Sequence, residues 1–213
     1  LFPVSGVSTR DLSVEPPAKG EGNEFRVISA GTLLRIKGFG LAIKAFMEFA
    51  ASHPDTEFTI VGTGPEESRL RALLRRSPLG SKVRLLPAMP RDELLLKIAS
   101  SDVFLFPSLR DGGGTVAIES MCLGKPVICL DTGGPGTHIT EECGVKVPLA
   151  SPQLAVQELS SALERLYLDD ELRLKMGKAA RTRANQHYHW DKLGDRLMTI
   201  YRCALGDQPS VPR

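Results

Sequence analysis

Short apolar runs alternate with amphipathic stretches along most of this chain. The apolar runs predict six strands, at Phe25–Ala30, Phe58–Val61, Val83–Leu86, Val103–Phe106, Val127–Leu130 and Val145–Val147. Helical periodicity fills the spaces near residues 38–52, 66–76, 91–99 and 115–123. Because strands that alternate with helices build a parallel sheet covered on both faces, the pattern predicts an α/β, Rossmann-like doubly wound domain.

The two ends of the chain depart from this alternation. Residues 1–24 are rich in Pro, Gly, Ser and charge, which predicts an interdomain linker or an extended crossover segment. After Pro152 the pattern is helical in three pieces, near residues 153–167, 170–186 and 190–204. We therefore expect one Rossmann-like domain over residues 25–205, with extra C-terminal helices, and a polar tail at 206–213.

Composition narrows the classes of partner and the compartment. A net charge of +2 over 213 residues gives no reason to propose a nucleic-acid partner. The four cysteines lack metal-ligand spacing, so free thiols and a cytoplasmic setting are expected. No apolar run approaches the roughly 18 residues of a membrane span, although peripheral contact of a longer protein with a membrane stays open. A first residue other than Met favours an excised fragment.

Glycine-rich loops follow several of the predicted strands, where an open parallel sheet binds its ligands. The loop at residues 31–38 holds Arg35 and Lys37, which could place a cation against a diphosphate; a turn with a solvated Lys explains it equally well. The loop that begins at Gly62 fails the dinucleotide-binding fingerprint, because Glu67 stands where the third glycine belongs. A dinucleotide oxidoreductase is therefore disfavoured.

The loop and helix after the fourth apolar run carry the most chemical information. Three successive glycines end at Gly114 and precede Thr115, a predicted N-cap, so free amides and the positive end of a helix would attract phosphate. Glu119 stands in an otherwise apolar helix, and a buried carboxylate needs a partner. The vicinal diol of a ribose would supply that partner; a structural Glu bonded to its neighbours is the competing interpretation. Asp111 alone is most often a turn residue.

The fourth such loop, residues 131–138, offers further glycine amides and could close over a ligand or simply connect two elements. His138 has no partner at ligand spacing, so no metal site is expected. His187 and His189 are expected to be surface or packing residues.

Asp111 and Glu119 are separated by seven positions and followed by Gly124-Lys125-Pro126-Val127. In this pattern the chain resembles the C-terminal, donor-binding domain of GT-B glycosyltransferases, specifically the retaining family 4. Supporting matches run through residues 25–203, among them Gly31 with Lys37-Gly38, Val61-Gly62, Pro107-Ser108, Gly133-Gly134, and a late helix with Trp190 and Tyr201.

The resemblance implies transfer of a hexose from a UDP-, GDP- or ADP-sugar to a glycan, a lipid-linked saccharide or a small molecule, without a metal or other cofactor. It implies that Lys37 contacts the donor diphosphate, Glu119 binds the ribose, and Asp111 holds the sugar, and these three are the predicted catalytic group. The predicted donor contacts are Gly31, Arg35, Lys37, Gly62, Ala88, Met89, Gly113, Gly114, Thr115 and Glu119.

The resemblance also implies an N-terminal acceptor domain that is absent from this sequence, so the isolated chain is expected to bind nucleotide weakly and not to turn over. Thr32 stands where the family commonly has Arg, and Gly113 stands where it often has an aromatic residue. Two alternatives stay open: a degenerate sugar-nucleotide-binding module, and a GT-B-like sugar-nucleotide epimerase.

Overall fold

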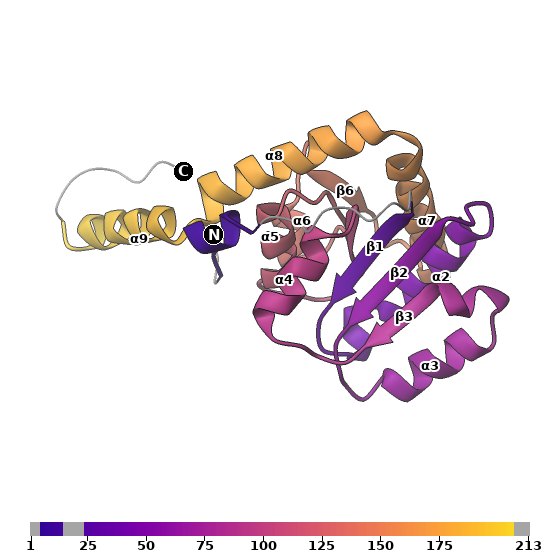
Figure 1. Cartoon of the computed structure of the whole chain (residues 1–213). Helices are drawn as coiled ribbons and strands as arrows, with labels where there is room; N and C mark the ends of the chain where they lie inside the picture. The colour runs from indigo at the N-terminus through magenta and orange to yellow at the C-terminus, as the bar shows by residue number, and fades with distance from the viewer. Residues whose placement is uncertain (1–4, 15–23, 207–213) are drawn as a thin grey trace.

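In a computed structural model, residues 5–14 and 24–206 are described, and all statements below concern them. Six parallel strands form one sheet in the order β3-β2-β1-β4-β5-β6 (Figure 1). The strands are β1 (Phe25–Ala30), β2 (Thr56–Val61), β3 (Val83–Leu86), β4 (Val103–Phe106), β5 (Val127–Leu130) and β6 (Gly144–Val147). The predicted fold class is confirmed. Strand order reverses between β1 and β4, so the ligand crevice of this topology lies beyond their carboxyl ends.

Helices cover both faces of the sheet. They are α2 (Phe39–Ala50), α3 (Glu67–Arg75), α4 (Arg91–Ala99), α5 (Thr115–Cys122), α6 (Gly133–His138), α7 (Pro152–Leu168) and α8 (Asp170–Tyr188), with short 3-10 helices η1 (Arg35–Lys37) and η2 (Pro78–Lys82). The central strand β4 is apolar throughout because both of its faces are buried. Val103 and Leu105 enter the core that α2 and α7 cover, whereas Phe104 and Phe106 enter the core that α4, α5 and α8 cover.

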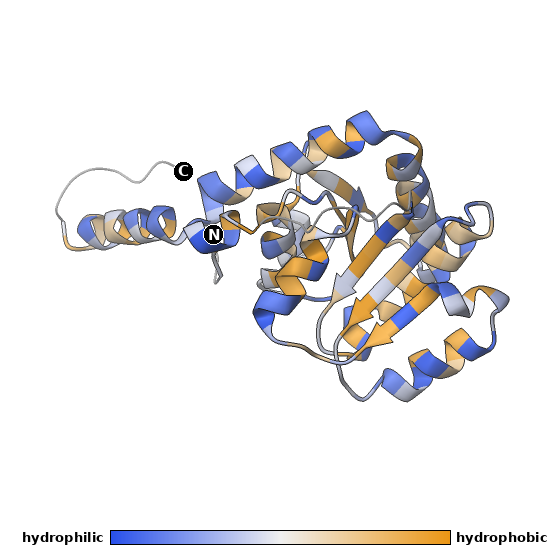
Figure 2. Cartoon of the chain, viewed as in Figure 1, coloured by the Kyte–Doolittle hydropathy of each residue, from blue (hydrophilic) through white to orange (hydrophobic). Residues whose placement is uncertain are grey.

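The last helix, α9 (Trp190–Ala204), extends from the end of α8 away from the sheet (Figure 1). Its apolar residues alternate with polar ones around the helix (Figure 2), and Leu193 is its one fully buried residue. His189 separates α8 from α9 in an extended conformation, with φ −66° and ψ 134°. The three predicted C-terminal helices are confirmed, with ends that differ by one or two residues.

The N-terminal segment packs against the junction of α8 and α9. Val7 is fully buried and forms a parallel bridge with His189, and its amide donates to the carbonyl of Tyr188 at 2.8 Å. A short helix, α1 (Thr9–Leu12), follows it. The remainder of the predicted linker, at 1–4 and 15–23, and the predicted tail beyond Gly206 lie outside the described residues, so the linker and domain limits stay predictions.

Candidate functional site

Four of the predicted donor contacts line one cavity of about 270 Å³ at the carboxyl ends of β1, β2 and β3. Gly31 and Gly62 contribute backbone from the first two loops, and Ala88 and Met89 contribute from the loop after β3. Gly62 has φ 155°, and a Cβ there would stand 2.0 Å from the carbonyl oxygen of Gly31. The two loops therefore pack backbone to backbone, and only glycine permits that approach. Thr32 lines the same cavity.

Lys37 is brought to Asp111 from the first loop. It ends η1, and the next residue, Gly38, is left-handed with φ 68°; a Cβ at Gly38 would stand 2.0 Å from the carbonyl oxygen of Pro107. This close packing fixes the first loop, residues 31–38, against the third loop, residues 107–114, which follows β4. The Lys37 ammonium group donates a hydrogen bond to Oδ2 of Asp111, whose side chain is 14% exposed.

The other carboxylate oxygen of Asp111 accepts from two backbone amides of its own loop. Oδ1 lies 3.1 Å from the nitrogen of Gly113 and 2.8 Å from that of Gly114. Burial opposes the charge of Asp111, but the bonds from Lys37 and these amides outweigh it and lower its pKa below the ordinary value. Two of the amides predicted to face phosphate are thus occupied by the protein itself.

The start of α5 corrects one prediction. Gly114, not Thr115, is the N-cap, in a left-handed conformation with φ 56°, and Thr115 is exposed at the first helical position. The Asp111 carboxylate bonds the amides of Gly113 and Gly114, which precede the helix, and no side chain caps α5 among the described residues. Among the described residues, no hydrogen bond uses the amides of Thr115 and Val116, so these donors stay open at the helix end.

Glu119, in the second turn of α5, is 8% exposed. Nε of Arg91 donates to its Oε1 at 2.7 Å. Burial raises the pKa of Glu119 above its ordinary value, and the bond from Arg91 offsets this only in part. Within the part of the chain that the structure describes, Oε2 of Glu119 takes no hydrogen bond, so this oxygen can accept from a ligand hydroxyl.

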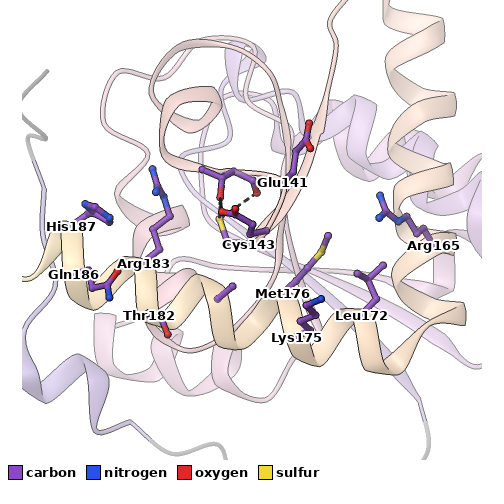
Figure 3. A pocket seen from close by; sticks show the side chains of 13 residues that line it. Glu141, Cys143, Arg165, Leu172, Lys175, Met176, Thr182, Arg183, Gln186 and His187 are labelled. Carbon is purple, nitrogen blue, oxygen red and sulfur yellow. Dashed lines mark hydrogen bonds between the residues drawn. The ribbon is translucent and has the colours of Figure 1, made fainter. Parts of the chain in front are cut away.

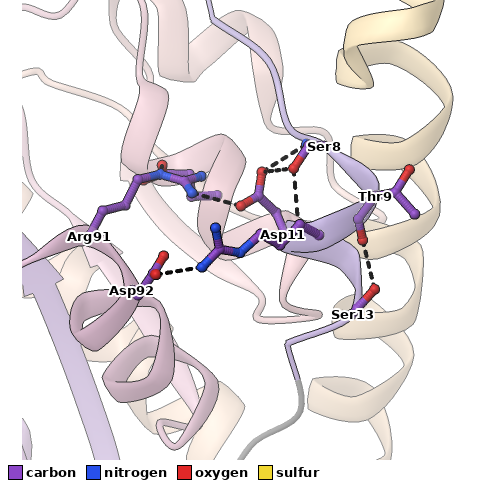
Figure 4. A network of polar contacts seen from close by, with 8 residues as sticks. Ser8, Thr9, Asp11, Ser13, Arg91 and Asp92 are labelled. Carbon is purple, nitrogen blue, oxygen red and sulfur yellow. Dashed lines mark hydrogen bonds and ion pairs between the residues drawn. The ribbon is translucent and has the colours of Figure 1, made fainter.

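Arg91 and its second partner were missed by the sequence reasoning. Arg91 begins α4, directly after the loop that holds Ala88 and Met89, and its Nη1 donates to Oδ1 of Asp11 at 2.7 Å (Figure 4). The hydrogen bonds to Asp11 and Glu119 raise the pKa of Arg91, so it stays charged. Arg91 is 28 positions from Glu119 and 80 from Asp11, and no local pattern connects residues so far apart.

His138, at the end of α6, lies beneath the third loop rather than in a metal site. It is 4% exposed, with Nε2 3.2 Å from the carbonyl oxygen of Gly113 and Nδ1 3.0 Å from the hydroxyl of Tyr188. The fourth loop also packs on the third, since the amide of Gly134 donates to the carbonyl of Asp111 at 2.8 Å. Over residues 5–14 and 24–206, no group of three or more His, Cys, Asp or Glu side chains could hold a metal ion.

Arg35 is the predicted donor contact that the structure does not bring to this group. It is exposed and lines a separate cavity of about 570 Å³ between α2 and α3, together with Lys44, Arg69 and Arg76. Its contact with a donor stays a prediction.

A third cavity, with a volume of about 720 Å³, also lies apart from the predicted site residues. The segment 140–143 and helices α7 and α8 line it, with Arg165, Lys175 and Arg183 at its rim (Figure 3). The thiol of Cys143, beside Thr140, is buried there.

None of the described helices is long and apolar enough to cross a membrane.

Comparison with known proteins agrees with this geometry. The sequence profile of the family described as Glycosyl transferases group 1 matches residues 14–183. The chain is 33% identical over 193 residues to a D-inositol 3-phosphate glycosyltransferase of Acidothermus cellulolyticus, covering 85% of this chain and 42% of the relative. It is 31% identical over 171 residues to a GDP-mannose-dependent monoacylated alpha-(1-6)-phosphatidylinositol monomannoside mannosyltransferase of Corynebacterium glutamicum, covering 77% and 43%. The chain thus spans less than half the length of these relatives.

Solved structures share the fold. A pneumococcal O-GlcNAc transferase, solved with UDP and GlcNAc, superposes with a TM-score of 0.80 at 22% identity, covering 95% of this chain and 39% of that one. Sucrose-phosphate synthase of Thermosynechococcus elongatus gives 0.78 at 24% identity, covering 96% and 52%. These neighbours are GT-B glycosyltransferases, and the profile covers most of the chain. The chain therefore belongs to the glycosyl transferases group 1 family.

Proposed function

We propose that this chain is the donor-binding half of a retaining glycosyltransferase that takes a nucleoside diphosphate sugar. The observation that carries the proposal is the buried carboxylate of Glu119, which has one oxygen held by Arg91 and the other without a hydrogen bond from the described residues. A carboxylate with a free oxygen accepts hydrogen bonds from the vicinal hydroxyls of a ribose. Glu119 is the proposed ribose ligand.

The base is proposed to enter the cavity formed by Gly31, Gly62, Ala88 and Met89. Its volume of about 270 Å³ suits a single heterocyclic base, and its walls are mainly backbone and small side chains. The loop that carries Ala88 and Met89 leads directly into Arg91, which is bonded to Glu119. This continuity supports base and ribose subsites that adjoin one another. The names of relatives mention both GDP-mannose and UDP, so the base itself is left to experiment.

The diphosphate is proposed to lie between Lys37 and the start of α5. The open amides of Thr115 and Val116 and the positive end of the helix would stabilise the charge that develops on the leaving diphosphate. Sugar binding would require the Asp111 carboxylate to leave the amides of its own loop and turn to the sugar hydroxyls. In this mechanism neither acid serves as a general base, and no metal is used.

Calorimetry of the chain against UDP, GDP and ADP, each with and without its sugar, tests the proposal. We expect one of the three to bind in the micromolar to millimolar range, and Glu119→Gln to weaken it by about 10-fold or more, because a hydrogen bond to a charged group contributes about 1.5–3 kcal/mol. Absence of binding by all three nucleotides, or equal affinity of the Glu119→Gln variant, contradicts the proposal.

We propose that the acceptor site lies in the part of the relatives that this chain does not span, since the chain covers 42% of the Acidothermus relative. We therefore propose that the chain binds donor without transferring its sugar, to a glycan, a lipid-linked saccharide or a small molecule. Transfer by the isolated chain would contradict this. A cytoplasmic location is part of the proposal, supported by the buried free thiols of Cys122, Cys129 and Cys143.

A sugar-nucleotide-binding module without transfer activity is the second candidate. Thr32 favours it, because this neutral residue lines the cavity at the place where the resemblance leads one to expect Arg. The Glu119→Gln change in the full-length protein tests this candidate: no loss of activity or of nucleotide binding would favour the module.

A further inference from the structure

The N-terminal segment 5–14 is fixed to the body of the domain on one side by its backbone. Val7 donates to the carbonyl of Tyr188, and the amide of Trp190 donates to the carbonyl of Val7 at 3.0 Å. Gly6 permits this approach, since a Cβ there would stand 2.7 Å from the carbonyl oxygen of Tyr188. The segment therefore enters α1 from a defined position.

Helix α1 is then fixed by its own capping box. Ser8 is the N-cap, and the carboxylate of Asp11 accepts from both the amide and the hydroxyl of Ser8, at 2.8 and 2.9 Å. These bonds occupy Oδ2 of Asp11 and direct its Oδ1 towards α4 (Figure 4). The cap therefore also orients a buried carboxylate whose side chain is 6% exposed.

Two ion pairs of opposite polarity join α1 to the first turn of α4. Arg10 pairs with Asp92 at 2.6 Å, and both side chains are largely exposed. Asp11 pairs with Arg91 at 2.7 Å, next to the candidate ribose ligand. The first pair is exposed and contributes little to stability, whereas in the second the carboxylate of Asp11 is buried and Arg91 is half-exposed.

The guanidinium group of Arg91 has a fixed planar geometry that presents two of its donors to two carboxylates. Nη1 bonds Asp11, and Nε bonds Oε1 of Glu119, each at 2.7 Å. The two bonds together constrain the plane of the guanidinium, so loss of the bond to Asp11 would let the direction of the bond to Glu119 change. The Glu119 carboxylate is thereby held at one oxygen, and the other is left without a protein donor among the described residues.

We propose that Asp11 and Arg91 are positioning residues for the ribose end of the donor site: the N-terminal segment, through Arg91, orients Glu119 for the vicinal hydroxyls of the nucleotide. The inference rests on the proposed function, and it makes residues 5–14 a part of the site rather than a passive linker. A change in the path of this segment would alter the orientation of the Glu119 carboxylate through the hydrogen bonds of Arg91 to Asp11 and to Glu119.

The test compares a ribonucleoside diphosphate with its 2′,3′-dideoxy analogue, using whichever of UDP, GDP and ADP binds the chain most tightly. The ratio of their dissociation constants reports the contacts to the ribose hydroxyls alone. We expect the ratio to be about 10 or more in the wild type and to fall close to 1 in Glu119→Gln. Arg91→Met should lower the ratio by about 5-fold or more, and Asp11→Asn by about 3-fold, with affinity for the dideoxy analogue changed less than 2-fold.

Arg10→Ala is the matched control, because it removes the other ion pair between the same two helices without touching Glu119. It should leave the ratio unchanged. Arg91→Lys, which keeps the charge but loses the planar fork, should restore only part of the ratio and serves if Arg91→Met fails to fold.

The outcomes separate the two proposals. If Glu119→Gln abolishes ribose discrimination but the Arg91 and Asp11 variants retain it, the positioning role is wrong and the proposed function stands. The role is also wrong if those variants weaken both analogues equally, which would indicate a purely structural network. If the wild type binds no nucleotide, or does not distinguish the two sugars, the proposed ribose role of Glu119 fails and the positioning role fails with it.

Discussion

Asp111 lies in the loop before α5, and Glu119 lies within α5. The surroundings of Asp111 stabilise its negative charge, whereas those of Glu119 disfavour it. Asp111 receives three hydrogen bonds, from Lys37 and from the amides of Gly113 and Gly114, and its pKa is lowered. Glu119 is more buried and receives one, from Arg91, and its pKa is raised. At the proposed phosphate end the carboxylate of Asp111 is therefore satisfied by the protein itself, whereas at the proposed ribose end one oxygen of Glu119 takes no hydrogen bond from the described residues.

This difference has a consequence for how a donor would enter. At the ribose end a ligand adds hydrogen bonds to an open acceptor and displaces only water. At the phosphate end it must compete with Asp111 for Lys37 and for the loop amides. We therefore expect affinity for the nucleoside part to be limited by contacts at Glu119, and affinity for the diphosphate part to be limited by the release of Asp111.

The largest expected effect follows from Lys37→Ala. The change removes the cation and leaves the Asp111 carboxylate unpaired beside the incoming diphosphate, so affinity for the nucleoside diphosphate should fall by about 100-fold. Calorimetric titration of the variant and the wild type with the nucleoside diphosphate measures this loss of affinity. The double variant Lys37→Ala with Asp111→Asn should recover part of the loss, since the repelling charge is gone; additive effects of the two changes would show that the residues do not interact in solution.

Glu119→Gln should act on the other end only. We expect affinity for the nucleoside diphosphate to fall by about 10- to 30-fold, because the neutral amide accepts more weakly from the ribose hydroxyls. Affinity for inorganic pyrophosphate, which has no ribose, should change less than 2-fold. A matching loss for pyrophosphate would mean that the two ends are not separate and that Glu119 supports the loop as a whole.

The sequence alone predicts the sheet and helices well, because each strand is a short, mainly apolar segment, apolar throughout in β4 and β5, and a helical pattern follows most of them. It also points to Asp111 and Glu119, since an acid among glycines and an acid within an apolar helix are both locally conspicuous. The partners of these acids are another matter. Arg91, which bonds Glu119, and Asp11, which bonds Arg91, reach the site only through the packing of distant elements, and their local sequence is that of an ordinary helix start and helix cap.

Packing between distant elements also explains why the structure differs from the prediction at the loop amides and at Arg35. The sequence shows three glycines with amides to offer, but whether a side chain already occupies them depends on the direction in which Asp111 turns. Arg35 and Lys37 are two positions apart in a 3-10 turn, which sends their side chains in different directions: Lys37 to Asp111, and Arg35 to the cavity between α2 and α3.

Asp111→Asn should give a smaller effect with opposite signs for two ligands. Without the competing charge, Lys37 is freed, so the nucleoside diphosphate without sugar should bind about 3-fold more tightly. The sugar-bearing donor should bind about 3-fold more weakly than the wild type, because a carboxylate accepts from sugar hydroxyls more strongly than an amide oxygen does. Titrations with UDP and UDP-glucose, or the matching pair for another base, measure both; a gain for both ligands would remove Asp111 from the sugar subsite.

The smallest effect concerns stability against pH, where the two acids should differ in sign. The lowered pKa of Asp111 gives the fold a contribution that is present above its ordinary value of 3.8 and is lost as the pH falls through the folded value. The raised pKa of Glu119 gives a contribution that is complete below 4.5 and is lost as the pH rises through the folded value. Urea unfolding of the wild type, Asp111→Asn and Glu119→Gln between pH 3 and pH 7 isolates each contribution by difference. On acidification the stability advantage of the wild type over Asp111→Asn should shrink, and its stability relative to Glu119→Gln should improve. Parallel curves for the two differences would show that the protein holds both carboxylates alike, and that the contrast between the two ends of the site does not exist in solution.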